Sequence, residues 1–284
     1  MSDPVVAIIA QGNMGAGVGA LLSRNGAKVV TSLAGRSQAS ARRAAAAGMV
    51  PVSDDEIGSA DFILSILPPG DAVALAEKLA PGMTAAKKKA VYADCNAISP
   101  ETAERVGAVV TAAGAVFVDV GIIGGPPGPS DAGPAFYLSG SDAGRFEALK
   151  PYGLQVKILD APIGGASALK MSFGGITKGT TAIGAAMTLA ASRAGVSDAL
   201  RAELAERVPG LLSWLDRSFP PMFGKAYRFV DEMEEIAQYL DPRGERGIFD
   251  GAARLYRHIA DDNDGGKQDV DALAKFAAAG KKPG

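Results

Sequence analysis

Short apolar runs alternate with helix-like segments along the first half of the chain. The run VVAIIA at residues 5–10 is followed by glycines and by the helical stretch GAGVGALLSRNG. Further runs are AKVVTSL, DFILSIL, AVYADC and AVFVDV, and the last strands of this half are expected in YLSGS and QVKILD. Short apolar runs bounded by turn residues are typical of buried strands. Their alternation with Ala-rich helical segments predicts repeated βα units on a parallel sheet.

The pattern changes after Pro162. Residues 164–195 are rich in Ala and Gly and contain no proline, which predicts one long helix. Amphipathic segments follow it, among them DALRAELAERV, GKAYRFVDEMEEIAQYL and GIFDGAARLYRHIA. The remainder is charged and flanked by glycines, as expected of a loosely attached tail. We therefore expect an α/β domain at residues 1–162, an all-helical domain at 163–262 and a flexible tail at 263–284.

Composition narrows the classes of function. The 284 residues carry a formal net charge of -2, so no basic field argues for a nucleic-acid partner. The single cysteine, Cys95, excludes an intramolecular disulfide, and the single histidine, His258, leaves no His/Cys cluster for zinc. No basic region precedes the first apolar run, and the longest apolar stretch, residues 106–118, is shorter than the ~20 residues of a membrane span. We expect a cytoplasmic protein without metal or membrane attachment.

The first chemical motif is the turn in IIAQGNMGAGVG. A strand, a turn with Gly12 and Gly15, and a helix that opens there form a site for a dinucleotide pyrophosphate, because the helix offers free N–H groups. Ala10 occupies the first glycine position of the G-x-G-x-x-G pattern, so an ordinary strand–turn–helix remains an alternative. The motif's place after the first strand favours the dinucleotide. The predicted fold class is α/β: a Rossmann-type doubly wound parallel sheet followed by an all-α domain.

The second strand bears on the choice between NAD and NADP. An acidic residue near its end binds the ribose 2′-hydroxyl of NAD, whereas an arginine accommodates the 2′-phosphate of NADP. Arg36 and Ser37 follow this strand, and no carboxylate occurs between Asp3 and Asp54. A polar surface turn also explains Arg36, but the sequence favours NADP, with NAD as the less favoured cofactor.

Several segments, in order, resemble the β-hydroxyacid dehydrogenase and 6-phosphogluconate dehydrogenase superfamily, from the start of the chain to about Lys178. AQGNMGAG resembles the family's G-x-G-x-M-G turn, and ADFILSILPPGDAV is similar to its strand that ends in Leu-Pro. The resemblance implies that Leu67 and Pro68 border the nicotinamide half of the cofactor. The cofactor-binding residues implied by the turn are Ala10, Gly12, Asn13, Met14 and Gly15.

Two further segments resemble the family's substrate-binding parts. DCNAISPET is similar to D-x-S-T-x-S-P, which implies that Asn96 meets both cofactor and substrate. FVDVGIIGGPPGPSDAGPAFYLSG resembles the glycine-rich substrate loop, with Gly124 and Gly125 as the paired glycines. Ile123 stands where that loop usually carries serine.

The segment GGASALKMSFGGI resembles the family's catalytic helix, which implies that Lys170 lies beside the nicotinamide. Oxidation of an alcohol needs a base for the hydroxyl proton while hydride leaves for the nicotinamide. A lysine in an apolar pocket has a lowered pKa and can be that base, or the acid in the reverse direction. The alternative is a surface lysine whose ammonium stays in water. Lys178, two turns further on, is a candidate for binding an anionic substrate group, or a solvated lysine.

Phe173 and Gly174 stand where the catalytic helix usually carries polar residues. With Ile123, they predict a wider and less polar pocket, suited to an aryl-substituted or branched hydroxy compound. The helical half resembles a superfamily subgroup whose second domain has no settled role, and the superfamily implies a homodimer.

The sequence thus favours an NADP-dependent oxidoreductase that uses Lys170 as general acid/base on a small hydroxy acid or a bulkier, less polar hydroxy compound. The alternatives are an imine or carbonyl reductase on the same fold, and a catalytically inactive NADP-binding regulatory protein.

Overall fold

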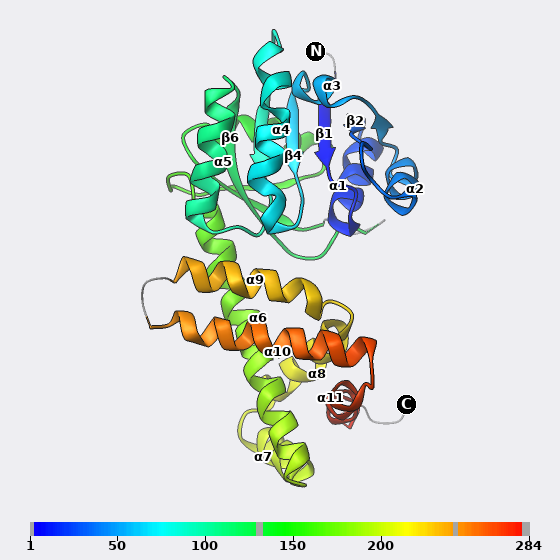
Figure 1. Cartoon of the computed structure of the whole chain (residues 1–284), viewed down its shortest axis with the longest axis vertical. Helices are drawn as coiled ribbons and strands as arrows, with labels where there is room; N and C mark the ends of the chain where they lie inside the picture. Colours follow the sequence, from blue (N-terminus) through cyan, green and yellow to red (C-terminus); the bar gives the residue numbers. More distant parts are fainter. Residues whose placement is uncertain (1–2, 129–132, 241–243, 280–284) are drawn as a thin grey trace. The chain divides into compact units, whose positions relative to one another are not determined.

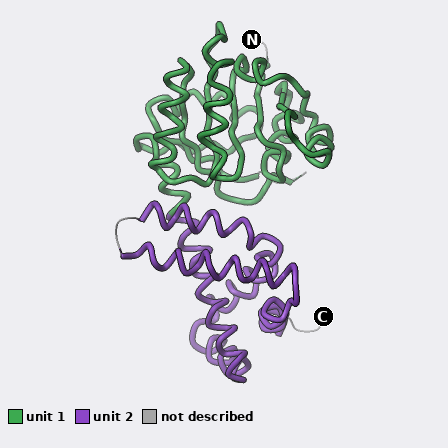
Figure 2. The backbone as a smooth tube through the Cα atoms, in the orientation of Figure 1, with its two compact units in different colours: residues 1–171 green, residues 172–284 purple. Residues whose placement is uncertain are grey.

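The computed structural model describes residues 3–128, 133–240 and 244–279. It divides into two compact units, unit 1 at residues 1–171 and unit 2 at residues 172–284 (Figure 2). The sequence pattern places the change of texture after Pro162, whereas the division comes later. The first turns of the long helix are held by contacts within unit 1, and these contacts build the candidate site below.

Unit 1 is built on one sheet. Its strands in the described residues run in the order β3-β2-β1-β4-β5-β6-β7-β8, and each neighbouring pair is parallel except β6 and β7, which are antiparallel. The mostly parallel, Rossmann-type sheet confirms the predicted fold class, while the antiparallel pair and the very short β3 were not foreseen. The strands are β1 Val5–Ile9, β2 Lys28–Thr31, β3 Val50–Pro51, β4 Phe62–Ser65, β5 Val91–Asp94, β6 Val116–Ile123, β7 Ala135–Ser139 and β8 Gln155–Ile158.

Helices cover both faces of this sheet (Figure 1). Alternate residues of β1 enter different cores: Val6 and Ile8 pack in one apolar cluster, Ala7 and Ile9 in the other. Burial on both faces explains why β1 is a continuous apolar run without polar alternation. The helical elements of unit 1 are α1 Asn13–Arg24, α2 Gln38–Ala46, α3 Asp54–Gly58, the 3-10 turn η1 Pro69–Asp71, α4 Ala72–Ala85, α5 Pro100–Ala112 and the 3-10 segment η2 Ala143–Tyr152.

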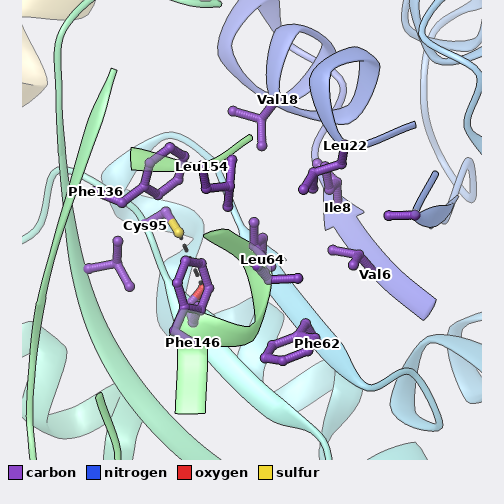
Figure 3. Close-up of a cluster of buried hydrophobic side chains, with 14 of the residues drawn as sticks. Val6, Ile8, Val18, Leu22, Phe62, Leu64, Cys95, Phe136, Phe146 and Leu154 are labelled. Carbon is purple, nitrogen blue, oxygen red and sulfur yellow. Dashed lines mark hydrogen bonds between the residues drawn. The ribbon is translucent and has the colours of Figure 1, made fainter. Parts of the chain in front are cut away.

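One of the two cores lies between the sheet and α1. Figure 3 shows Val6 and Ile8 of β1 with Val18 and Leu22 of α1 in the same cluster. Cys95 also belongs to this cluster and is a free, buried thiol. Burial raises the pKa of the Cys95 thiol, so this residue behaves as a small apolar filler.

The long helix α6, Gly165–Arg193, matches the stretch predicted as one helix, and the amphipathic segments after it are helical as predicted. In α9, which is Ala226–Tyr239, Val230, Met233 and Ile236 are buried, while Tyr227 is exposed. The other helices of unit 2 are α7 Ser197–Arg207, α8 Pro209–Phe223, α9 Ala226–Tyr239, α10 Arg246–Asp264 and α11 Gln268–Ala278.

The segment expected to be a flexible tail contains α11. Its residues Val270, Leu273 and Phe276 are buried, and Phe276 packs near the ring of Phe219. Arg201 donates to the Phe276 carbonyl oxygen at 2.7 Å. Apolar spacing within a charged segment is a weak signal, and these contacts bind α11 into unit 2. Among the described helices, none has the length and apolar character that a bilayer span requires.

Candidate active site

The predicted cofactor residues meet at one edge of the sheet. The chain passes from β1 to β2 and β3 on one side and then returns to β4 on the other side of β1, so the strand order reverses between β1 and β4. Ligands of open α/β sheets bind outside the carboxyl ends of the strands at such a switch point. Ala10 follows β1, Leu67 and Pro68 follow β4, and Asn96 follows β5. These residues are therefore neighbours at the edge where a dinucleotide is expected.

The turn after β1 leaves the start of α1 open. Gly12 is the N-cap residue of α1, with extended backbone and no side-chain hydrogen bond to the helix. A Cβ added to Gly12 would meet no described atom within 4 Å, so this glycine keeps the approach to the helix N–H groups clear. Asn13 is exposed and Met14 is half-buried. The free N–H groups and the helix dipole suit an anion at this point.

Gly15 has a different role. A Cβ there would lie 1.9 Å from the carbonyl oxygen of Ala10, so only glycine allows α1 to lie this close to the turn. The turn keeps this close packing although Ala10 replaces the first glycine of the pattern. The open N-terminus of α1 and the tight packing at Gly15 fit a dinucleotide pyrophosphate.

The end of β2 is polar and largely buried. Gln11 is 1 % exposed; its Nε2 donates to the Thr31 hydroxyl and to the Ser32 carbonyl oxygen, the latter at 3.1 Å. The Gln11 Oε1 atom has no hydrogen-bond partner among the described residues. Sequence reasoning missed this amide, which ties the turn after β1 to the end of β2.

Arg36 and Ser37 lie where a 2′-phosphate is expected. Arg36 is exposed, and the Ser37 hydroxyl accepts from the Ser40 N–H at 3.2 Å as the N-cap of α2. Arg43, which the sequence did not single out, donates from Nε to the Gln11 carbonyl oxygen at 2.7 Å and from Nη2 to the Ser40 hydroxyl at 3.1 Å. A second guanidinium thus lies beside the turn. The spacing of Ser37, Ser40 and Arg43 by three residues on a helix was the available signal.

A carboxylate from a later segment, that of Asp54, reaches the end of β2. A hydrogen bond with Ser32, and then the ammonium of Lys78, hold the pKa of Asp54 below its usual range. Lys78 lies 2.9 Å from the Asp54 carboxylate and neutralises its charge. The absence of acidic residues between Asp3 and Asp54 in the sequence therefore does not keep carboxylates away from this strand end.

Lys170 lies in the second turn of α6. Its Nζ donates to the carbonyl oxygen of Cys95 at 3.3 Å and to that of Asn96 at 3.2 Å, and these bonds are partly buried. The amine is therefore held at the carboxyl end of β5, on the sheet edge that also carries the glycine turn after β1. A lysine whose ammonium extends into bulk water would make no such contacts.

Asn96 has its side chain turned inward. It is 2 % exposed; its Nδ2 donates to the Ser65 hydroxyl at 2.8 Å and to the Asp94 carboxylate at 2.9 Å, while its Oδ1 accepts from the Leu67 N–H at 2.5 Å. The amide thus uses both of its N–H bonds to join the ends of β4 and β5. The structure brings Asn96 to the predicted edge, with its side chain already engaged by the protein.

Asp94 is a buried carboxyl beside this group. Burial, the largest cause, raises its pKa to about 7; the neighbouring Asp119 raises it further, and the bonds from Asn96 and the charge of Lys170 oppose the rise. Asp94 and Asp119 are register partners on β5 and β6. No motif in the sequence connects these two carboxyls with Lys170.

The predicted substrate loop begins at the end of β6. Ile123 is the last residue of β6, and Gly124 has a φ of +127°, which requires glycine. A Cβ on Gly125 would meet no described atom within 4 Å. A Cβ on Gly17 of α1 would lie 3.0 Å from the ring of Pro127, so the loop lies along α1. Residues 129–132 of the loop are outside the described residues.

Phe173, Gly174 and Lys178 belong to unit 2. Lys178 pairs with Glu232 at 2.6 Å, and its Nζ lies 5.2 Å from the centre of the Phe229 ring. The ammonium proposed for an anionic substrate group therefore already has a carboxylate partner in unit 2. Phe173 is half exposed, and a Cβ on Gly174 would lie 3.7 Å from the Lys178 Nζ.

Residues 5–152 match the family described as the NAD binding domain of 6-phosphogluconate dehydrogenase. Residues 191–259 match a domain of unknown function. The first match spans the sheet edge described above, and the second falls within unit 2 and says nothing of its role.

Known proteins share this architecture. A conserved protein of unknown function, described as structurally similar to 3-hydroxyacid dehydrogenases, is 28% identical with a TM-score of 0.67 over 90% of this chain and 99% of its own. The mitochondrial 3-hydroxyisobutyrate dehydrogenase of Drosophila melanogaster is 26% identical over 51% of this chain and 44% of its own length. An imine reductase variant from Myxococcus stipitatus in complex with NAD+ is 19% identical, with a TM-score of 0.58 over 96% of this chain and 99% of its own.

Proposed function

This chain belongs to the family that shares the NAD binding domain of 6-phosphogluconate dehydrogenase, and we propose that it is an NADP-dependent oxidoreductase. It transfers hydride between the nicotinamide and the hydroxyl or carbonyl carbon of a small hydroxy acid or a bulkier, less polar hydroxy compound. The hydroxyacid-dehydrogenase-like fold supports the reaction class. The apolar Ile123 in the substrate loop supports the less polar substrate.

The observation that carries this proposal is the placement of the Lys170 amine at the sheet edge. Two carbonyl oxygens hold it, those of Cys95 and Asn96. When bound, the nicotinamide supplies the hydride acceptor or donor. Neutral Lys170 accepts the substrate hydroxyl proton in oxidation, and its ammonium returns a proton to the carbonyl oxygen in reduction. The two carbonyl groups orient the amine by accepting its other N–H bonds.

Residues of unit 1 would hold the cofactor. The backbone N–H groups at the start of α1, from Asn13 onward, would bind the pyrophosphate; Gly12 leaves the approach to them open, and Gly15 lets α1 lie close to Ala10. Met14 packs into the core below the turn. Leu67 and Pro68 border the nicotinamide half.

Two arginines support the preference for NADP. Arg36 is exposed after β2, and Arg43 is fixed beside the turn by the Gln11 carbonyl oxygen. Titration with NADPH and NADH is expected to give tighter binding of NADPH. Arg36→Ala and Arg43→Ala are each expected to weaken NADPH binding by about tenfold, as for loss of one charge-assisted hydrogen bond, and to leave NADH binding unchanged. Equal, weak binding of both cofactors would remove the NADP assignment.

A substrate panel with a lysine control tests the reaction. Hydroxy acids and bulky alcohols are offered with NADP+, and the matching carbonyl compounds with NADPH. Lys170→Ala is expected to lower kcat by about 10²- to 10⁴-fold, the contribution of one general acid/base, with cofactor Kd unchanged. Lys87→Ala, at an exposed lysine, is the matched control. An unimpaired Lys170→Ala variant would make Lys170 an ordinary surface lysine.

Imine reduction is the second candidate, favoured by the fold shared with an imine reductase and by the apolar Ile123. The same panel therefore includes a cyclic imine with NADPH. Turnover of the imine that survives Lys170→Ala, without turnover of any alcohol, would select this candidate. Tight NADPH binding with no turnover of any compound would select the inactive regulatory protein.

We also propose a homodimer. Ile176, Ile183 and Met187 of α6 are 72%, 60% and 57% exposed, which is a large apolar stripe for a surface helix. Light scattering after gel filtration measures the mass, and a monomer over the micromolar range would contradict the proposal.

A further inference from the structure

Asp119 lies beneath the start of the helix that carries Lys170. It is fully buried on β6, and its Oδ2 accepts from the N–H groups of Gly164, Ala166 and Ser167 at 3.0, 3.0 and 3.1 Å. Its Oδ1 accepts from the Ser167 hydroxyl at 2.6 Å. One carboxylate therefore satisfies N–H groups at the start of α6 that have no partner inside the helix.

The same carboxylate is fixed from the sheet. The Ser139 hydroxyl of β7 donates to the Asp119 Oδ2 at 2.8 Å, and Ser139 is the register partner of Asp119. Donors thus reach Asp119 from β7 as well as from α6. Such surroundings stabilise a buried carboxylate, because hydrogen bonds and the positive end of a helix dipole replace its hydration.

Gly121 is the next residue of β6 on the same side of the sheet. A Cβ at Gly121 would lie 2.6 Å from the carbonyl oxygen of Ala166 and 3.3 Å from the Cβ of Lys170. The first contact involves backbone and cannot be relieved by a side-chain rotation. Any larger residue at position 121 must therefore displace α6 at the turn that carries Lys170.

We propose that Asp119 and Gly121 of β6 are positioning residues that set where the first turns of α6 place the Lys170 amine. Asp119 fixes the start of α6 by hydrogen bonds, and Gly121 sets how closely that turn approaches the strand. Together they place the Nζ of Lys170 at the carbonyl oxygens of Cys95 and Asn96. The inference rests on the proposed function for its catalytic meaning, while the placement of the amine is testable without turnover.

The decisive experiment measures the amine itself. Wild type, Asp119→Asn and Gly121→Ala, free of cofactor, are treated with limiting acetic anhydride, and acetylation of Lys170 is read by peptide mass spectrometry relative to the exposed Lys87. Asp142→Asn, at a half-exposed aspartate, and Gly144→Ala, where a Cβ would meet no described atom within 4 Å, are the matched controls. Ser167→Ala, which removes only one hydroxyl donor, is the milder variant if Asp119→Asn does not fold.

Both test variants are expected to acetylate Lys170 about tenfold faster, because the amine leaves its two carbonyl partners, while the controls match wild type. In turnover, kcat is expected to fall about 100-fold, the scale of a 1 Å misplacement, with cofactor Kd unchanged within twofold. Unchanged acetylation of Lys170 in folded Asp119→Asn, Gly121→Ala and Ser167→Ala would overturn the inference. Faster acetylation together with full activity of Lys170→Ala would support the placement and would remove the proposed function.

Discussion

Two helices of the candidate site begin in opposite ways. The N-terminus of α1 has a glycine cap and no side-chain hydrogen bond, so its N–H groups remain open at the sheet edge. The N-terminus of α6 is closed by the buried carboxylate of Asp119. Both ends have the same unsatisfied groups by virtue of helix geometry. The chain supplies its own anion where a helix must be fixed, and leaves the place free where an anionic cofactor is proposed to bind.

The largest expected effect comes from removing the Asp119 carboxylate, which closes the N-terminus of α6. Asp119→Ala leaves several buried N–H and hydroxyl donors without a partner, and each such loss costs about 1–3 kcal/mol. We expect the free energy of unfolding to fall by about 3–5 kcal/mol. Urea unfolding followed by circular dichroism measures this free energy of unfolding. Asp142→Ala, at a half-exposed aspartate, is the control. A loss below about 1 kcal/mol would show that the start of α6 does not depend on this carboxylate.

Asp94 is a second buried carboxyl and differs from Asp119, since its two oxygens accept from the Asn96 N–H and Nδ2, whereas Asp119 accepts from several groups of α6 and β7. Its pKa is raised to about 7, so the folded state holds more protons than the unfolded state between pH ~4 and ~7. This carboxyl therefore lowers stability as pH rises through that window, by up to about 1.4 kcal/mol per pH unit.

Asp94→Asn removes this titration. The stability of the variant relative to wild type is expected to increase between pH 5 and pH 8, whatever its value at pH 5. Thermal or urea unfolding at both values of pH gives the difference, in which the other titrating groups cancel. Parallel pH profiles for the two proteins would contradict the raised pKa.

The open end depends on Gly15. In Gly15→Ala, the new Cβ clashes with the Ala10 carbonyl oxygen, and overpacking of this kind costs about 1–3 kcal/mol. The turn must move, so NADPH affinity is expected to fall at least tenfold. Isothermal titration and urea unfolding measure the two effects, with Gly144→Ala as control. Wild-type affinity in a folded Gly15→Ala variant would show that the phosphate turn is elsewhere.

The smallest expected effect comes from a substitution that gives the open N-terminus of α1 a side-chain cap. Gly12→Ser places a side-chain cap on α1 at a φ of -72°, which any residue adopts, and the added Cβ meets no described atom. Stability is expected to rise by a few tenths of a kcal/mol, because serine is the better N-cap. NADPH binding is expected to weaken, since the hydroxyl competes for the same N–H groups. Gains in both properties would contradict the anion site.

The sequence was sufficient to predict those features that depend on a continuous local pattern of residues. Alternating apolar runs predicted the βα units, and the long proline-free segment predicted α6. The glycine turn and the stretch around Lys170 are continuous motifs, so their residues could be named before their contacts were known.

Asp119, Gly121 and Arg43 could not be found in the same way. Asp119 interrupts an apolar strand, but its donors come from residues 139 and 164–167, and a single sequence does not show which distant N–H groups a carboxylate meets. Asn96 shows the converse. Its motif predicted a ligand contact, and the long-range bonds to Ser65 and Leu67 reveal that its amide holds strand ends together.

The missing side chain at Gly17 has a practical consequence. Pro127 occupies the space that a Cβ at position 17 would take, so the loop that follows β6 uses α1 as its support. Position 17 is therefore a site outside the proposed pocket at which a substitution is expected to change the range of substrates. Alanine or serine at position 17 would press on Pro127 and shift the start of this loop, while Lys170 and the turn after β1 keep their own contacts.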